Sequence, residues 1–206
     1  MRRRAAGELG RRTALTGIAG VLGTGIWSTG IGGGGIAHAA PADGRLVYDF
    51  TLTSIDGKPM PLKAYAGHPL LIVNTASFCG YTYQYEALQR VWERYRDRGL
   101  VVIGLPSGDF ANQEYGANGE IKTFCETRFD IDFPMTEKVH VRGPAAAPIF
   151  LWLRQELGDG PGPLWNFHKY LVDADGRAVA SFPSALDPDH PDILAAIERL
   201  LRPRAG

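Results

Sequence analysis

The chain has 206 residues, of which 45% are apolar and 21% charged, and it carries no net charge when histidine is neutral. This is enough for one compact domain with a hydrophobic core and too little for two. Five arginines against one glutamate lie in residues 1–39, so the remainder is mildly acidic. We therefore expect neither nucleic acid nor an anionic membrane surface as a partner.

The cysteine and histidine content limits the chemistry further. Only two cysteines occur, Cys79 and Cys125, which excludes a dense disulfide scaffold and a four-thiolate zinc site. The five histidines are scattered without the spacing of metal ligands. We expect no bound metal or other cofactor.

Residues 1–39 have the character of an export signal. Arg11 and Arg12 precede a glycine-rich, moderately apolar stretch, which ends in the small residues of the sequence AHAA. The paired arginines resemble the signals read by the twin-arginine translocase, which exports folded proteins. This resemblance implies that the protein works in the bacterial periplasm.

A membrane anchor is the alternative for the same stretch. Residues 14–36 contain nine glycines and lack the density of Leu, Ile and Val that stabilises a spanning helix. We therefore expect no stable membrane anchor. We predict removal of residues 1–39 by cleavage after Ala39, leaving a domain of residues 40–206.

The remaining elements follow in chain order. Residues 47–52 and 60–62, with an Asp-Gly turn signal at 56–57 between them, predict a small amino-terminal β-hairpin. Apolar runs at 69–74 and 100–105 predict strands buried on both faces, joined in parallel by an amphipathic helix over 83–98 that Gly99 closes. Later segments predict a helix at 119–128, strands at 167–172 and 178–182, and a last helix from Pro191. The pattern predicts an α/β domain with a central mixed β-sheet flanked by helices.

Cys79 lies between the first buried strand and the amphipathic helix. Unpaired backbone N–H groups and the helix dipole at such a position stabilise negative charge on a sulfur. Position alone is modest support, because an unpaired cysteine is more often a small buried hydrophobic residue.

The segment around Cys79 adds a motif. Residues 74–85 read NTASFCGYTYQY, which resembles the active-site segment of the glutathione peroxidase family, N-x-A-S-x-C-G-x-T-x-Q-Y, at every defining position. Four further segments are similar to that family's motifs in the same order: FANQE at 110–114, EIKTFC at 120–125, FPM at 133–135 and WNFHK at 165–169. The resemblance extends from about residue 47 to 201, and it implies a thioredoxin-like fold.

The resemblance also implies a site. Cys79 would be the attacking sulfur of a thiol peroxidase that reduces H₂O₂ and organic hydroperoxides, lipid hydroperoxides included, to water or an alcohol. Gln113, Trp165 and Asn166 would converge on it as neutral hydrogen-bond donors. Neutral donors leave the sulfur basic enough to remain a good nucleophile. Taken singly, each of the three donors would be read as an ordinary core, surface or loop residue.

Cys125 matches the family position that supplies a resolving thiol. We expect it to attack the sulfenic acid of Cys79 and form an intramolecular disulfide, which a dithiol protein such as a thioredoxin-like protein, or glutathione, then reduces. Because Cys125 falls in a predicted helix, this step requires local unfolding of residues 122–127. A static stabilising disulfide is the alternative for two cysteines in an exported chain.

The sequence also departs from the family. Residues 104–110 read GLPSGDF where the family often has G-F-P-C-N-Q-F, and Tyr115 replaces a common proline. The longer insertion of tetrameric members is missing between Pro148 and Trp165, which by resemblance implies a monomer or small homo-oligomer. Its site would then be open to bulky hydroperoxides.

Two rival functions remain open on the sequence. An exported thioredoxin-like thiol-disulfide carrier would keep its redox pair at the same turn, but it would need Cys-x-x-Cys, and the fourth position here is Thr82. An exported binding or structural protein with an inert sulfur is the other.

Overall fold

The computed structural model describes residues 44–158, 160 and 162–201. The predicted signal sequence, residues 1–39, lies outside the described residues. Within the described part of the chain, no helix has both the length and the apolar character needed to cross a bilayer.

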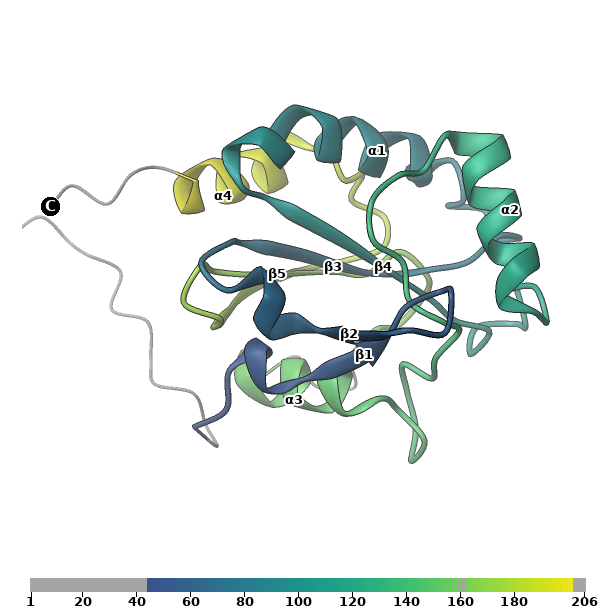
Figure 1. Ribbon diagram of the computed structural model, residues 1–206, viewed down its shortest axis with the longest axis horizontal. Helices are drawn as coiled ribbons and strands as arrows, with labels where there is room; N and C mark the ends of the chain where they lie inside the picture. Colours follow the sequence, from purple (N-terminus) through teal and green to yellow (C-terminus); the bar gives the residue numbers. More distant parts are fainter. Residues whose placement is uncertain (1–43, 159, 161, 202–206) are drawn as a thin grey trace, which may run out of the picture. The chain divides into compact units, whose positions relative to one another are not determined.

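Four strands form a central sheet in the order β4-β3-β5-β6 (Figure 1). The strands are β3 (Leu70–Thr75), β4 (Val101–Pro106), β5 (Lys169–Val172) and β6 (Ala178–Phe182). β3 pairs in parallel with β4 and antiparallel with β5, which pairs antiparallel with β6. The predicted mixed sheet is therefore confirmed. All residues of β3 and β4 are buried, as their continuous apolar runs predict.

Helices cover both faces of this sheet. α1 (Gln84–Tyr95) and α4 (Pro191–Leu200) lie on one face, and α3 (Pro148–Leu157) lies on the other (Figure 1). The alternation of side chains along β3 explains two separate cores, because Leu71 and Val73 cluster with residues of α1 and α4. Leu70 and Ile72 cluster with residues of α3 and the hairpin.

The predicted amino-terminal hairpin is present. It consists of β1 (Thr51–Thr53) and β2 (Pro59–Pro61), paired antiparallel. Its first strand is shorter than the predicted 47–52, because η1 (Val47–Asp49) is a 3-10 turn. The carboxylate of Asp49 accepts a hydrogen bond from the Leu46 N–H at 2.8 Å, which favours the turn over an extended strand.

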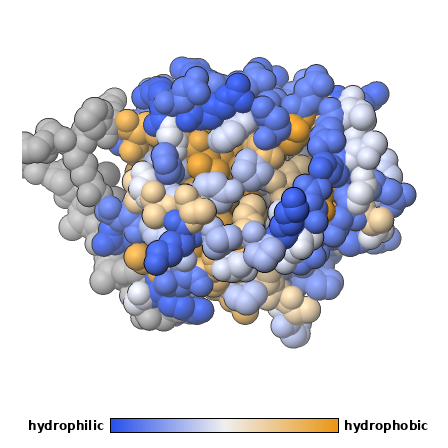
Figure 2. All heavy atoms as spheres, in the orientation of Figure 1, coloured by the Kyte–Doolittle hydropathy of each residue, from blue (hydrophilic) through white to orange (hydrophobic). Residues whose placement is uncertain are grey.

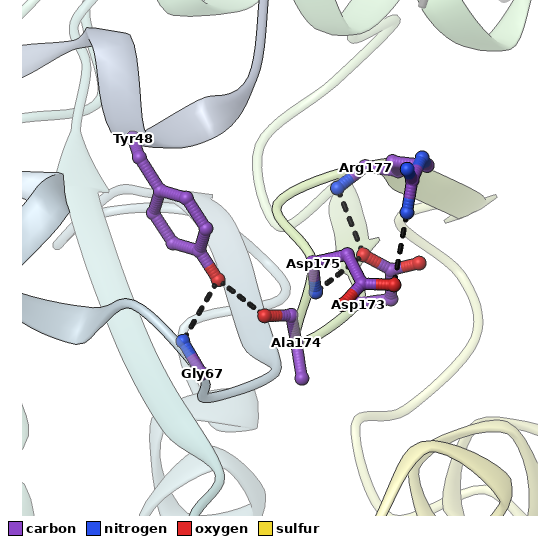
Figure 3. A network of polar contacts seen from close by, with 6 residues as sticks. All are labelled: Tyr48, Gly67, Asp173, Ala174, Asp175 and Arg177. Carbon is purple, nitrogen blue, oxygen red and sulfur yellow. Dashed lines mark hydrogen bonds and ion pairs between the residues drawn. The ribbon is translucent and has the colours of Figure 1, made fainter. Parts of the chain in front are cut away.

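The start of the described chain is fixed to the turn between β5 and β6 (Figure 3). The Tyr48 hydroxyl donates to the Ala174 carbonyl at 2.8 Å and accepts from the Gly67 N–H at 3.2 Å. Gly176 in that turn has φ +86°, and a Cβ there would lie 2.7 Å from the Tyr48 ring. Only glycine fits both the backbone conformation and this approach.

Helix α1 follows the sequence prediction closely. The short turn η3 (Arg96–Arg98) extends it, and Gly99 ends it with φ +99° in the left-handed region, as predicted. α2 (Asn118–Phe129) and α4 match the predicted helices at 119–128 and from Pro191. One further 3-10 turn, η2 (Leu62–Tyr65), follows the hairpin.

Helix α3 was not predicted from the sequence. Residues 149–153 are all apolar, so they show no alternation of apolar and polar residues with a helical period. The helix buries Ile149, Phe150, Trp152 and Leu153 against the sheet. Pro148 at its first position and Gly158 in the left-handed conformation after it are the signals that mark its ends.

Candidate active site

Cys79 lies in the turn between β3 and α1. The hydroxyl of Thr82 accepts a hydrogen bond from the Cys79 N–H and donates one to the Ala76 carbonyl, both at 2.9 Å. These two bonds close the turn and fix the backbone of Cys79. The residue is 8% exposed, so its sulfur lies just beneath the surface.

The sulfur of Cys79 accepts a hydrogen bond from the backbone N–H of Tyr81 at 3.4 Å. Within the described residues, no side chain donates to this sulfur. Both Cys79 and Cys125 are free thiols. The neutral donors that the sequence predicts for the sulfur are therefore placed by other contacts.

Gln113 and Asn166 contact each other directly. The Asn166 Nδ2 donates to the Gln113 Oε1 at 3.1 Å. The backbone carbonyl of Gln113 also accepts from the Phe78 N–H at 2.9 Å, which brings the loop after β4 against the residue before Cys79. Asn166 is fully buried, and its Oδ1 has no partner among the described residues.

Trp165 reaches the same region through two other contacts. Asn74, at the end of β3, donates from Nδ2 to the Trp165 carbonyl at 3.1 Å, and its own Oδ1 accepts from the His168 N–H at 3.0 Å. The Trp165 ring lies 5.6 Å from the ring of Phe110, measured between centroids. Trp165 is 38% exposed, so part of the residue is open to solvent.

The structure thus joins Gln113 to Asn166 side chain to side chain. It ties Gln113 to the turn of Cys79, and Trp165 to the strand that precedes that turn. It shows no hydrogen bond from any of the three side chains to the Cys79 sulfur. The catalytic roles of these residues stay predictions.

Cys125 lies in α2 and is 1% exposed. Its burial raises the pKa of the thiol to about 12, while the nearby Tyr85 hydroxyl opposes the shift and the carboxylate of Glu114 adds to it. Glu114 is itself buried, which raises the pKa of its carboxyl group. In this conformation Cys125 is protonated and shielded from solvent.

Helix α2 is weakly held in the core. Ile121 and Cys125 are its buried residues. A hollow of about 260 Å³ lies behind Cys125, between α2, the residues after β1 and the segment 131–135. Unfolding of this helical turn would therefore expose one fully buried residue, Cys125, and the partly buried ring of Phe124.

Two large side chains are exposed in the turn of Cys79 and just after it. Phe78 is 53% exposed and Tyr83 52%. The Phe78 ring packs at 4.4 Å on Tyr115, which packs at 5.6 Å on Phe124 of α2. In the view of Figure 2, the outer surfaces of α1 and α2 are hydrophilic, and hydrophobic residues come to the surface between α1 and the hairpin.

Several contributors to the site were not assigned a role from sequence. Asn74 and Thr82 stand inside the motif around Cys79, so the motif was a signal for them, but only the contacts show what they hold. The Tyr81 N–H leaves no sequence signature. Among the described residues, no three His, Cys, Asp or Glu side chains gather as metal ligands.

Comparison with known proteins agrees with the motifs. Residues 47–154 match the family described as Glutathione peroxidase. The Hydroperoxy fatty acid reductase gpx1 of Synechocystis is 45% identical over 75% of this chain and 95% of its own length. A Glutathione peroxidase of Lactococcus lactis is 38% identical over 69% of this chain and 92% of its own length.

Solved structures show the same fold. The crystal structure of T. cruzi GPX1 superposes with a TM-score of 0.63 and 31% identity over 76% of this chain and 97% of that one. The solution structure of a putative thioredoxin from Neisseria meningitidis gives a TM-score of 0.55 at 13% identity, over 76% and 89% of the two chains. The second likeness shows that the fold is thioredoxin-like.

Proposed function

The chain belongs to the glutathione peroxidase family and is a peroxidase that reduces hydroperoxides, and on that premise we propose that Cys79 is its attacking sulfur. The thiolate attacks the terminal oxygen of the hydroperoxide, the O–O bond breaks, and the alkoxide leaves as an alcohol after taking up a proton. The sulfur is oxidised to a sulfenic acid. The peroxide is reduced.

One observation carries this assignment. Cys79 lies in the turn that leads into α1, with Thr82 fixing its backbone and the Tyr81 N–H directed at its sulfur. A backbone donor and a helix amino terminus both stabilise negative charge. We propose that Gln113, Asn166 and Trp165 are neutral donors that hold the peroxide oxygens during attack. The contacts of Gln113 with Phe78 and Asn166, and of Trp165 with Asn74, support this.

For the second half of the cycle we propose that Cys125 is the resolving thiol. Its sulfur attacks the sulfenic sulfur of Cys79, a disulfide forms, and water leaves. A dithiol protein of the thioredoxin type, or glutathione, then reduces the disulfide and becomes oxidised itself. The weak packing of α2 supports the unfolding of residues 122–127 that this step requires.

We propose bulky hydroperoxides, including those of fatty acids, as substrates beside H₂O₂. Phe78 and Tyr83 expose apolar surface close to Cys79 in the chain, on which a hydrocarbon chain could lie. The relative from Synechocystis carries the name of a hydroperoxy fatty acid reductase, which supports the same substrate class.

The test is turnover of H₂O₂, cumene hydroperoxide and a phospholipid hydroperoxide, each with glutathione and with a dithiol protein. We expect Cys79→Ser to abolish turnover under every condition. We expect Cys125→Ser to abolish turnover with the dithiol protein but not with glutathione. Full turnover by Cys79→Ser would overturn the assignment of the attacking sulfur. Equal rates for wild type and Cys125→Ser with the dithiol protein would remove the resolving role only.

We also propose that residues 1–39 direct twin-arginine export to the periplasm, where the enzyme acts as a monomer or small homo-oligomer. The paired Arg11 and Arg12 support this. In a bacterial host we expect the mature protein, beginning at Ala40, in the periplasmic fraction. The double variant R11K/R12K should leave the uncleaved chain in the cytoplasm, and unchanged export of that variant would contradict the proposal.

A further inference from the structure

The loop between β4 and α2 is anchored by one carboxylate. Asp109 Oδ1 is paired with the His140 Nδ1 at 2.6 Å, and Oδ2 accepts from the backbone N–H groups of Val141 at 2.7 Å and Arg142 at 3.2 Å. Partial burial acts to raise the pKa of Asp109, but these hydrogen bonds lower it overall. The carboxylate is therefore ionised and held at both oxygens.

The loop that Asp109 anchors has a strained backbone. Ala111 and Asn112 both have φ +53°, in the left-handed region, and neither is glycine. Two such residues in succession are unfavourable unless contacts on either side hold the conformation. Asp109 precedes this strained turn in the chain, and Gln113, the proposed donor to the peroxide, follows it.

A second line of contacts runs from the same anchor to Trp165. The Arg142 guanidinium lies 5.2 Å from the centroid of the Phe110 ring, and the Phe110 ring lies 5.6 Å from that of Trp165. Phe110 is 2% exposed, so it has little freedom to adjust on its own. Asp109 accepts a hydrogen bond from the backbone N–H of Arg142, and the side chain of Arg142 packs on Phe110, the residue after Asp109.

We propose that Asp109 is a positioning residue of the peroxidase site. By holding the segment 140–142 against the loop 107–113, it sets Arg142 on Phe110, and Phe110 in turn sets the indole of Trp165. The same anchor keeps the strained turn at 111–112 closed and Gln113 directed at Asn166. The inference rests on the proposed function, since it takes Trp165 and Gln113 as the groups that must be placed.

The Asp109 anchor depends on residues in which this chain departs from the family pattern. Residues 107–109 read SGD, where the family often has C-N-Q. A neutral side chain at 109 could not offer two anionic oxygens to one imidazole and two backbone N–H groups. A role confined to stability would lower the melting temperature and leave the site of the folded protein unchanged.

The experiment compares Asp109→Ala, Asp109→Asn and Arg142→Ala with wild type in two measurements made on folded protein. The first is the second-order rate of Cys79 oxidation by H₂O₂. The second is the emission spectrum of Trp165, obtained as the difference between each protein and the same protein carrying W165F. Asp49→Asn is the matched control, because Asp49 also accepts from a backbone N–H but lies in η1.

We expect Asp109→Ala to lower the oxidation rate by about tenfold or more and to shift the Trp165 emission, because small displacements of catalytic groups carry large rate penalties. Asp109→Asn keeps one acceptor oxygen, so its oxidation rate and its Trp165 emission should lie between those of wild type and Asp109→Ala. Arg142 is exposed, so its alanine variant should fold, and it should reproduce the spectral shift even if Asp109→Ala does not fold.

Wild-type rates and spectra in Arg142→Ala and Asp109→Asn would overturn the inference. W165F in the wild-type background separates this failure from failure of the proposed function. If W165F oxidises Cys79 at the wild-type rate, the donor role of Trp165 fails, and any positioning by Asp109 acts through Gln113 alone. If W165F is slow and the Asp109 and Arg142 variants are not, the positioning role alone fails.

Discussion

Asn166 donates from Nδ2 to Oε1 of Gln113 at 3.1 Å, although the two residues are 53 positions apart in the chain. The bond fixes which end of the Gln113 amide faces Asn166. Because the oxygen is engaged there, the Nε2 group of Gln113 is free to donate elsewhere. Asn166 therefore sets the direction in which Gln113 presents its donor.

This pairing predicts strong coupling between the two amides. We expect Gln113→Ala and Asn166→Ala each to lower the rate of Cys79 oxidation by about a hundredfold or more, as expected for loss of one catalytic donor. The double variant should be little slower than either single variant, because each already disrupts the pair. Stopped-flow oxidation by H₂O₂ measures all four proteins, with Gln155→Ala, an exposed amide of α3, as the control. Multiplicative losses in the double variant would show that the two amides act independently.

The buried thiol of Cys125 predicts a difference in reactivity between the two cysteines. With its pKa at about 12, only about one Cys125 in ten thousand is ionised at pH 8, and burial also blocks access. We expect iodoacetamide at pH 8 to label Cys79 first in the reduced protein, and to label Cys125 only after prolonged exposure or in urea. Peptide mass spectrometry over a time course measures both sites. Labelling of Cys125 as fast as that of Cys79 would show that α2 is already open in the reduced enzyme.

The stability of α2 should control the resolving step. Thr123 is exposed within the helix, so substitutions there act mainly through helix propensity. Alanine favours a helix over glycine by about 1 kcal/mol. If α2 unfolds before Cys125 attacks, Thr123→Gly should form the Cys79–Cys125 disulfide about fivefold faster than Thr123→Ala. The rate of disulfide formation is measured by adding one equivalent of H₂O₂ and quenching samples of the reaction over time.

Two comparisons protect that interpretation. The rate of Cys79 oxidation should be the same in both Thr123 variants, because that step does not require α2 to open. Ala195→Gly makes the same exchange at an exposed position of α4 and should leave disulfide formation unchanged. Equal disulfide rates in Thr123→Ala and Thr123→Gly would mean that α2 does not unfold before the attack.

The sheet and most of the helices were predictable because their residue patterns reflect burial. β3 and β4 are covered on both faces, so they read as continuous apolar runs, and α1 alternates apolar and charged residues with the helical period. α3 could not be predicted in this way, because Leu151 is an exposed apolar residue in the middle of an apolar run. η1 depends on the Asp49 carboxylate, a contact that periodicity does not record.

Sequence motifs predicted which residues belong to the candidate site, but not the contacts between them. The segment around Cys79 identified the sulfur, and the later motifs identified its predicted partners. The pairing of Asn74 with the Trp165 carbonyl joins residues 91 positions apart, and no local pattern records it. Asp109 was visible as a departure from the family. Its role depends on a loop that meets it only in the folded chain.

Lys169 lies in the same motif as Trp165 and Asn166, and it is completely buried in β5. Its ammonium group donates to the Gln84 Oε1 at 2.6 Å, to the Ser184 carbonyl at 3.3 Å and to the Leu186 carbonyl. All three acceptors are neutral. Burial therefore lowers the pKa of Lys169 to about 7 from its ordinary 10.5, and the carboxylate of Asp187 opposes this shift with a smaller effect.

This lowered pKa predicts a pH dependence of stability. Between about pH 7 and 10.5 the unfolded chain holds a proton on Lys169 that the folded chain has largely released. Because the unfolded state binds more protons in that window, the free energy of unfolding rises with pH there. As the pH falls from 10.5 through about 7, that stability is lost, since the folded protein must then hold a buried charge.

Lys169→Met isolates the effect. We expect the difference in unfolding free energy between wild type and Lys169→Met to change in favour of wild type from pH 6.5 to pH 9, as measured by urea denaturation at both values. Lys63→Met removes an exposed lysine and should show no such change with pH. Because other groups titrate in the same range in all three proteins, the decisive quantity is the difference between wild type and variant. A difference that is constant with pH would mean that Lys169 is charged to the same extent in the folded and unfolded chains, so that its burial in β5 does not displace its proton.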